Sequence, residues 1–188
     1  MTLADDPSDD PLLVAALAWH DAGYCVVPAH EDRGKRPFGA WKQYQAIRPT
    51  TGELTRWLST GRYTGIGVIT GAVSGDVEML EVEGRAVRAG AIDRLNDAAE
   101  HAGIGPLWER VMRGCIEQSP SGGLHLFVRV TGGPAMPNTK LARTVDPDTG
   151  EVLVLSETRG AGGFVVVAIS HPGSLPEVCK LSLQTWCK

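Results

Sequence analysis

Two glutamates separated by one residue stand at the end of an apolar run in residues 77–83 (VEMLEVE). The alternation of side chains along a strand would place Glu81 and Glu83 on one face, with Leu80 and Val82 on the other. At strand spacing the two carboxylates lie ~7 Å apart and repel each other. A divalent cation between such hard oxygen ligands would turn the repulsion into a binding site. A solvent-exposed sheet face carrying two acids is the alternative interpretation.

A turn rich in serine and glycine occupies residues 119–125 (SPSGGLH), between two strand-like runs. This arrangement predicts a β-hairpin. Gly122 and Gly123 would let backbone amides approach the phosphate oxygens of a nucleotide, and Ser121 and His125 would donate further hydrogen bonds. An ordinary tight turn, followed by a strand whose histidine faces water, would have the same pattern.

A third segment, residues 155–163 (LSETRGAGG), combines a carboxylate, an arginine and a glycine-rich turn. Glu157 at a strand end would be a further metal ligand, and the guanidinium of Arg159 would bind phosphate. The turn predicts a second hairpin, with strands at residues 152–157 and 164–169. Glycine-rich turns need no function, so this segment is informative only together with the other two.

Charge is unevenly distributed along the 188 residues, whose net charge is −4. Acids dominate between positions 76 and 100, whereas the segment from position 33 to 62 has a single acid, Glu53. The basic residues of that segment are Arg33, Lys35, Arg36, Lys42, Arg48, Arg56 and Arg62. A basic stretch beside an acidic cluster suits an enzyme that holds phosphates and a divalent metal. Two solvated faces of opposite charge are the alternative.

The composition is that of a globular protein, with 43% hydrophobic and 21% charged residues. No run approaches the ~18 apolar residues of a membrane span, and the acidic N-terminus does not resemble a signal peptide. A cytoplasmic protein without membrane contact is therefore expected. The four cysteines form no CxxC pair, and we interpret them as reduced thiols, with Cys25 and Cys115 buried.

Start and stop signals indicate the elements that position these residues. Residues 1–10 are acidic, lack apolar periodicity and are expected to be disordered. Asp10 predicts the N-terminus of a helix that ends near Gly23. Thr50 and Glu53 form a capping box for a second helix.

The middle of the chain predicts helices over residues 86–113, interrupted at 103–106, and a polar loop over residues 131–150. Antiparallel hairpins combined with helices indicate an α+β fold. Residues 11–172 would form this domain. Residues 173–188 would be a tail or the start of a following segment.

Taken together, the three segments in this order resemble the prim-pol domains of the archaeo-eukaryotic primase superfamily, which occur in phage and plasmid replication proteins. The likeness extends from about residue 15 to residue 172. It also includes residues 23–28 (GYCVVP), 35–37 (KRP) with Trp41, 65–71 (GIGVITG) and 162–166 (GGFVV). The combination is specific, although no single segment is.

The resemblance implies an RRM-like antiparallel catalytic sheet with flanking helices, joined to a smaller α/β unit. It implies that Glu81, Glu83 and Glu157 hold Mg²⁺ or Mn²⁺, and that Ser121 and His125 contact the phosphates of the incoming nucleotide. The family usually has Asp-x-Asp or Asp-x-Glu at the acidic pair, so each carboxylate here is one methylene longer where glutamate replaces aspartate. An unperturbed imidazole is neutral above about pH 7.5, so the contact of His125 with phosphate is expected to weaken there.

The implied activity is that of a nucleotidyltransferase, a DNA primase/polymerase that adds an NTP or dNTP to a primer or to an initiating nucleotide. Lys35, Arg36 and Lys42 are candidates for contacts with template or nucleotide phosphates. The chain has no Walker motif, so a helicase domain or protein would lie outside it. A phage-encoded protein of this kind would work in the cytoplasm of a bacterial host.

Two other functions remain open on the same scaffold. A non-catalytic nucleic-acid-binding module would need aromatic side chains on the sheet for base stacking, and the chain has only three Phe and three Tyr. A metal-dependent nuclease would use the same acids but would hydrolyse DNA without any dependence on nucleotides.

Overall fold

The computed structural model describes residues 10–30 and 36–167. Apart from Asp10, the expected acidic N-terminal segment lies outside this part of the chain, as do residues 173–188. Asp10 caps helix α1 (Pro11–Asp21) as predicted, because its carboxylate accepts a hydrogen bond from the Leu12 N–H at 2.9 Å. Gly23 follows the helix with a φ of 96°, a left-handed value that suits glycine at a helix end.

Helix α2 (Thr51–Leu58) begins with the predicted capping box. The Thr50 hydroxyl accepts a hydrogen bond from the Glu53 N–H at 3.2 Å, and the Glu53 carboxylate accepts one from the Thr50 N–H at 2.8 Å. Short 3-10 helices occur at η2 (Trp41–Gln45) and η3 (Ala72–Ser74). The starts of both α-helices therefore follow from local sequence signals.

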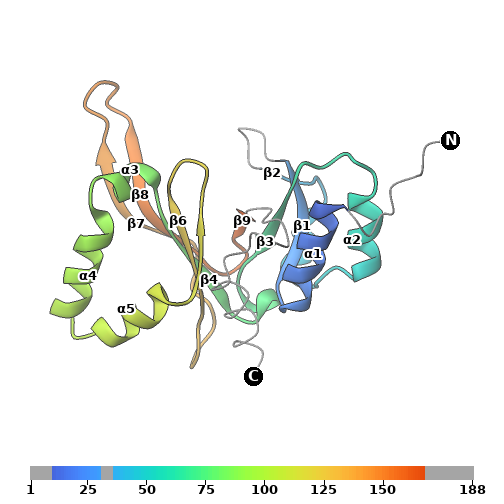
Figure 1. Cartoon of the computed structure of the whole chain (residues 1–188), viewed down its shortest axis with the longest axis horizontal. Coiled ribbons are helices and arrows are strands. Elements are labelled where there is room, and N and C mark those ends of the chain that lie inside the picture. The colour runs from blue at the N-terminus through green and yellow to red at the C-terminus, as the bar shows by residue number, and fades with distance from the viewer. Residues whose placement is uncertain (1–9, 31–35, 168–188) are drawn as a thin grey trace.

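The strands form two antiparallel sheets, which we call the small sheet and the large sheet (Figure 1). The small sheet has the order β2-β1-β3-β9 and comprises β1 (Cys25–His30), β2 (Arg36–Pro37), β3 (Gly65–Ile69) and β9 (Phe164–Val167). The large sheet has the order β5-β6-β4-β8-β7 and comprises β4 (Val77–Val82), β5 (Cys115–Gln118), β6 (Leu124–Arg129), β7 (Thr139–Val145) and β8 (Val152–Arg159).

Helices lie on the outer side of each sheet in Figure 1. Helices α3 (Gly84–Arg88), α4 (Ala91–His101) and α5 (Gly105–Met112) pack on the large sheet, around a cluster that includes Val82 and Leu126. Helices α1 and α2 pack on the small sheet. This arrangement confirms the α+β class and the helical region. The interruption expected at residues 103–106 falls at residues 102–104, and a further break at residues 89–90 was not predicted.

Two expectations for the second half of the chain are wrong. Strands β8 and β9 do not form a hairpin, because β8 pairs with β4 and β7 in the large sheet whereas β9 pairs with β3 in the small sheet. The glycine-rich turn between them carries the chain from one sheet to the other. The expected loop at residues 131–150 contains β7, an edge strand whose seven residues are all exposed. Because neither face of β7 is covered, it lacks the apolar alternation by which strands are recognised.

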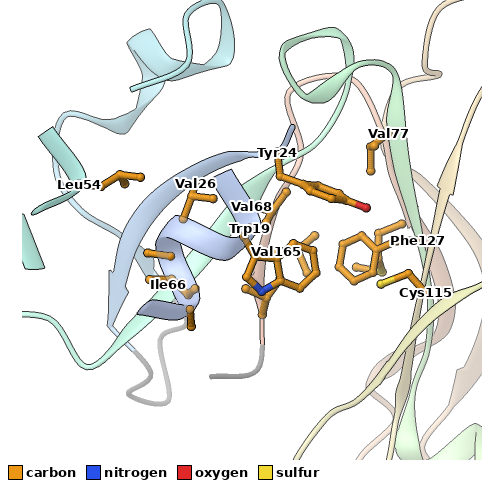
Figure 2. Packing of buried hydrophobic residues seen from close by; sticks show 14 of the residues in the cluster. Trp19, Tyr24, Val26, Leu54, Ile66, Val68, Val77, Cys115, Phe127 and Val165 are labelled. Carbon is orange, nitrogen blue, oxygen red and sulfur yellow. The ribbon is translucent and has the colours of Figure 1, made fainter. Parts of the chain in front are cut away.

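The main core joins the two sheets through a group of aromatic side chains (Figure 2). Trp19 of α1 and Tyr24 before β1 point toward Phe127 of β6, with ring-centroid distances to Phe127 of 5.5 and 6.2 Å. Cys115 of β5 lies beside Phe127 in the same core. This packing fixes the inner face of the large sheet against the small sheet and its helices.

We expect Phe127→Leu to lower the free energy of unfolding by about 1–2 kcal/mol, since it removes two aromatic contacts together with part of the buried area. Urea denaturation followed by tryptophan fluorescence would measure the change. Leu141→Ala serves as the control, because Leu141 is 57% exposed and its truncation should change stability by less than about 0.5 kcal/mol. Equal effects of the two variants would contradict the role given to the aromatic group.

The cysteines within the described residues behave as predicted. Cys25 and Cys115 are buried and form no disulfide. Burial raises the pKa of the Cys25 thiol to about 12, against a smaller opposing effect of Arg48, so this thiol is protonated and unreactive at neutral pH. Cys179 and Cys187 lie outside the described residues.

Candidate active site

One row of directly opposed residues crosses the large sheet. Glu81 on β4 is paired with His125 on β6 and with Glu157 on β8, and His125 is paired in turn with Glu117 on β5. Opposed residues of antiparallel strands have Cβ atoms about 4.5–5.5 Å apart and project from the same face. We call Glu117, His125, Glu81 and Glu157 the titratable row. On the edge strand β7, Lys140 continues it beside Glu157.

The titratable row lies on the inner face of the large sheet, the face that is turned toward the small sheet. Met79 and Phe127, two residues along from Glu81 and His125, belong to the core between the sheets. Leu80 and Val82 point the other way and pack under the helices, as the alternation in the sequence predicts. The side chains of the row are largely enclosed, with exposed fractions of 5% for Glu117, 8% for His125, 15% for Glu81 and 13% for Glu157.

His125 lies between two carboxylates. Its Nδ1 is 3.6 Å from Oε2 of Glu117, and its Nε2 is 3.7 Å from Oε1 of Glu81. Burial alone would lower the pKa of His125, but interactions with Glu117 and Glu81 outweigh it and raise the pKa to about 9. The imidazole is therefore charged at neutral pH, and the expectation that it becomes neutral above about pH 7.5 is wrong. The shift arises from residues on two other strands, of which the hairpin partner Glu117 is specified locally in the sequence and Glu81 is not.

Glu157 forms an ion pair with Arg159, its neighbour along the same face of β8. Arg159 is 36% exposed, so its guanidinium can reach a ligand from solvent. The glycine-rich turn that follows is tightly packed. The Gly160 N–H donates to Oδ1 of Asn138 at 2.9 Å, and a Cβ on Gly160 would overlap the Met136 carbonyl oxygen. The glycines of this turn thus have a packing role.

Glu83 lies one residue past the end of β4, at the N-cap position of α3, where its side chain makes no capping hydrogen bond. Its N–H donates to the Leu155 carbonyl at 2.9 Å, so the chain stays beside β8 for one residue beyond the strand. The predicted strand over residues 77–83 is therefore one residue too long. Glu83 is half-buried, at the point where the β5–β6 turn also reaches β4.

The β5–β6 hairpin is confirmed, and its turn closes on itself. The Gly122 N–H donates to the Ser119 carbonyl at 2.8 Å, and the Gly123 N–H donates to the Ser119 hydroxyl at 3.0 Å. Both amides that the sequence analysis assigned to phosphate are therefore engaged within the turn. The Ser121 and Ser119 hydroxyls are 3.0 Å apart at an exposed site, where they remain accessible to a ligand.

The turn is fitted against the junction of β4 and α3. A Cβ on Gly123 would stand 2.9 Å from the Val82 carbonyl oxygen, and one on Gly84 would overlap the Ser121 carbonyl oxygen. Arg88 of α3 donates to that same Ser121 oxygen at 3.0 Å. Arg88 is exposed and adds a guanidinium beside the turn, which the sequence analysis did not single out.

We expect Gly84→Ala to displace the β5–β6 turn and to lower stability by about 1–3 kcal/mol, the usual cost of inserting a methyl group into a packed contact. Thermal unfolding would measure the loss. Gly52→Ala is a matched control in α2, because no atom lies within 4 Å of the position of its Cβ. If Gly84→Ala were as stable as Gly52→Ala, the turn would not depend on this close approach.

The basic stretch of the sequence is only partly a binding surface. Arg33 and Lys35 lie outside the described residues, and Arg36 begins β2. Arg48 has a structural role, since its guanidinium donates to the His20 carbonyl oxygen and so ties the chain to α1. The basic side chains of this stretch that the structure shows as exposed are Lys42, Arg56 and Arg62.

The carboxylate oxygens of the row are the type of ligand that a hard divalent cation binds. Glu81 and Glu157 face each other with little solvent exposure, and oxygen is the donor that Mg²⁺ and Mn²⁺ prefer. Within residues 10–30 and 36–167, no three His, Cys, Asp or Glu side chains stand close enough to hold a metal among themselves. Mg²⁺ is commonly held by one or two carboxylates, with water and substrate phosphates completing its shell, so the opposed pair suffices for that type of site.

The α+β class of the two antiparallel sheets and their helices agrees with the fold class that the resemblance implies. The chain matches the Prim-Pol family, described as "Bifunctional DNA primase/polymerase, N-terminal", over residues 16–179, and it belongs to that family. No curated protein matches the chain. Membership implies a nucleotidyltransferase-type domain of DNA replication that binds DNA and nucleotides. None of the helices in the described part of the chain has the length and apolar character that crossing a membrane requires.

Proposed function

We propose that this chain is a DNA primase/polymerase domain of phage or plasmid replication and that the titratable row is its active site. The observation that carries the proposal is the direct opposition of Glu81 and Glu157 on neighbouring strands, with His125 in the same row. Each of these two carboxylates also has a cationic neighbour, His125 for Glu81 and Arg159 for Glu157. The pair is thereby kept together on an enclosed face despite its mutual repulsion.

The opposed pair Glu81 and Glu157 would hold Mg²⁺ or Mn²⁺ directly, and Glu83 at the end of β4 would contact the metal through a water of its shell. When bound, the cation would assist the attacking hydroxyl and neutralise charge on the reacting phosphates. The protein itself would position the reacting groups. The primer or initiating nucleotide would present its 3′-hydroxyl to the α-phosphate of an incoming NTP or dNTP, and pyrophosphate would leave as the new P–O bond forms.

The triphosphate would lie between the β5–β6 turn and Arg159. Ser121 offers an exposed hydroxyl and Arg159 offers a guanidinium. Gly122 takes the left-handed φ of 80° within the turn, and Gly123 lets the turn approach β4. Nε2 of His125 is at an ion-pair distance of 3.7 Å from Glu81, and we assign its N–H to a phosphate oxygen beside Glu81.

Contacts with the DNA template would come from the basic stretch. We assign Lys35, Arg36 and the exposed Lys42 to the phosphates of template or nucleotide, a contact that does not depend on sequence. Strand separation would be the work of a helicase domain or protein outside this chain, in the cytoplasm of a bacterial host.

Primer extension tests the proposal against its alternatives. A labelled primer on a short template, with nucleotides and either Mg²⁺ or Mn²⁺, should be lengthened by the protein, and EDTA should stop the reaction. Shortening of the DNA without added nucleotides would indicate a nuclease instead. A protein that binds DNA but makes no product in either metal, whether or not a primer is supplied, would be a non-catalytic binding module.

A further inference from the structure

Glu117 is a buried carboxylate to which the proposed reaction assigns no ligand or substrate. It lies on β5, the outermost strand at its end of the large sheet, yet both of its carboxylate oxygens are shielded from solvent. Burying an ionised carboxylate is costly unless a cation compensates it. His125 faces Glu117 directly in the strand register, with Nδ1 3.6 Å from Oε2.

The contacts with Glu117 and Glu81 together favour one orientation of the imidazole ring. With Nδ1 turned toward Glu117, Nε2 is turned toward Glu81 on the opposite side. A half-turn of the ring about its Cβ–Cγ bond would exchange these nitrogens for carbon atoms, which donate no strong hydrogen bond. A flipped ring would face Glu81 with a C–H group, and without a carboxylate at position 117 only Glu81 would oppose that flip.

We propose that Glu117 is a positioning residue that acts through His125, fixing the ring so that the Nε2–H group faces Glu81 and the nucleotide phosphate beside it. This inference rests on the function proposed above. Buried carboxylates commonly act in this way, by orienting a second group that contacts the ligand. The hairpin register makes the arrangement rigid, because Glu117 and His125 lie on adjacent strands joined by one short turn.

Glu117→Leu tests the inference, since it removes every acceptor while keeping a side chain of similar length. Binding of a non-incorporable nucleotide, measured by calorimetry in Mn²⁺, should weaken about tenfold, the effect of losing one charge-assisted hydrogen bond. Glu117→Gln retains an oxygen that can accept from Nδ1–H and should recover most of the affinity. Glu109→Leu, the same change at an exposed site on α5, is the control and should bind as the parent does.

A double-mutant comparison separates positioning from a general effect on the fold. If Glu117 acts through His125, Glu117→Leu should weaken nucleotide binding no further in a His125→Ala background. Equal effects in both backgrounds would overturn the inference. So would a Glu117→Leu variant that melts at a lower temperature but binds nucleotide within about twofold of the parent, because that pattern means a purely structural role.

The ring orientation can also be measured without activity. Proton NMR contacts from the Cε1–H and Cδ2–H groups of His125 should report one orientation in the parent and a second one in Glu117→Leu. An unchanged single orientation in that variant would overturn the positioning role, even in an active protein. Conversely, a parent that neither binds nor incorporates nucleotides would refute the proposed function, while these contacts would still decide whether Glu117 orients the ring.

Discussion

Glu81→Gln should abolish nucleotide incorporation and leave the domain folded. Glu81 lies between His125 and Glu157 in the titratable row and is directly opposed to both, so it joins the proposed phosphate donor to the second carboxylate. The amide has nearly the same shape but no charge with which to hold a divalent cation. Loss of such a ligand removes on the order of several kcal/mol of transition-state stabilisation, which corresponds to about a thousandfold or more in rate.

Single-turnover primer extension in Mn²⁺ would measure this loss, with near-UV circular dichroism as the check on folding. Glu78→Gln is the matched control, because Glu78 is on the same strand but projects from the opposite face, where it accepts a hydrogen bond from the Met136 N–H. That variant should keep activity within a few-fold of the parent. Comparable rates for Glu81→Gln and Glu78→Gln would remove Glu81 from the active site.

His125→Ala is expected to have the second-largest effect, lowering kcat/KM for the nucleotide by about a hundredfold through a higher KM and a lower turnover. The change removes the donor proposed for phosphate and leaves Glu81 without its cationic neighbour. Mn²⁺ affinity in the absence of nucleotide should not fall, because no metal ligand is lost and a positive charge beside Glu81 disappears. Nucleotide titrations at fixed Mn²⁺, beside Mn²⁺ titrations without nucleotide, separate the two effects. If the variant lost Mn²⁺ binding but kept its nucleotide KM, His125 would be a metal ligand.

The same residue gives a pH dependence of stability. The pKa of His125 is about 9 in the folded protein, above the ordinary value of 6.5, so the folded state holds the proton more tightly than the unfolded state. This stabilisation is fully present below pH 6.5 and is lost as the pH rises through about 9. The difference in unfolding free energy between the parent and His125→Ala should therefore shrink between pH 7 and pH 10 in urea titrations. A difference independent of pH would mean that the ion pairs with Glu81 and Glu117 contribute nothing.

Local signals in the sequence predicted the elements that depend on neighbouring residues. The caps at Asp10 and Thr50 and the β5–β6 hairpin are determined within a few positions, and the structure confirms them. The alternation around Glu81 likewise predicted that Leu80 and Val82 lie on the opposite face of the strand, which the structure covers with helices. Expectations failed where pairing is decided by distant segments. Phe164 after the glycine-rich turn finds its partner at Ile69, in a different sheet, and no local pattern specifies that choice.

The pairing of Glu117 with His125 could have been predicted from the sequence. Once the hairpin is closed by the pair of Gln118 and Leu124, the next pair is Glu117 and His125 by counting alone. The elevated pKa of His125 follows from that pair together with Glu81. The opposition of Glu81 and Glu157 could not be counted in this way, because the two residues lie 76 positions apart in the chain.

Anomalous diffraction from crystals containing Mn²⁺ and a non-incorporable nucleotide would test the central claim most directly, because it locates the metal and the triphosphate in one measurement. The proposed active site predicts a manganese peak beside the carboxylates of Glu81 and Glu157, with the phosphates extending toward Ser121 and Arg159. A manganese peak and a bound nucleotide elsewhere on the domain, with the titratable row empty, would contradict the assignment of this row as the active site.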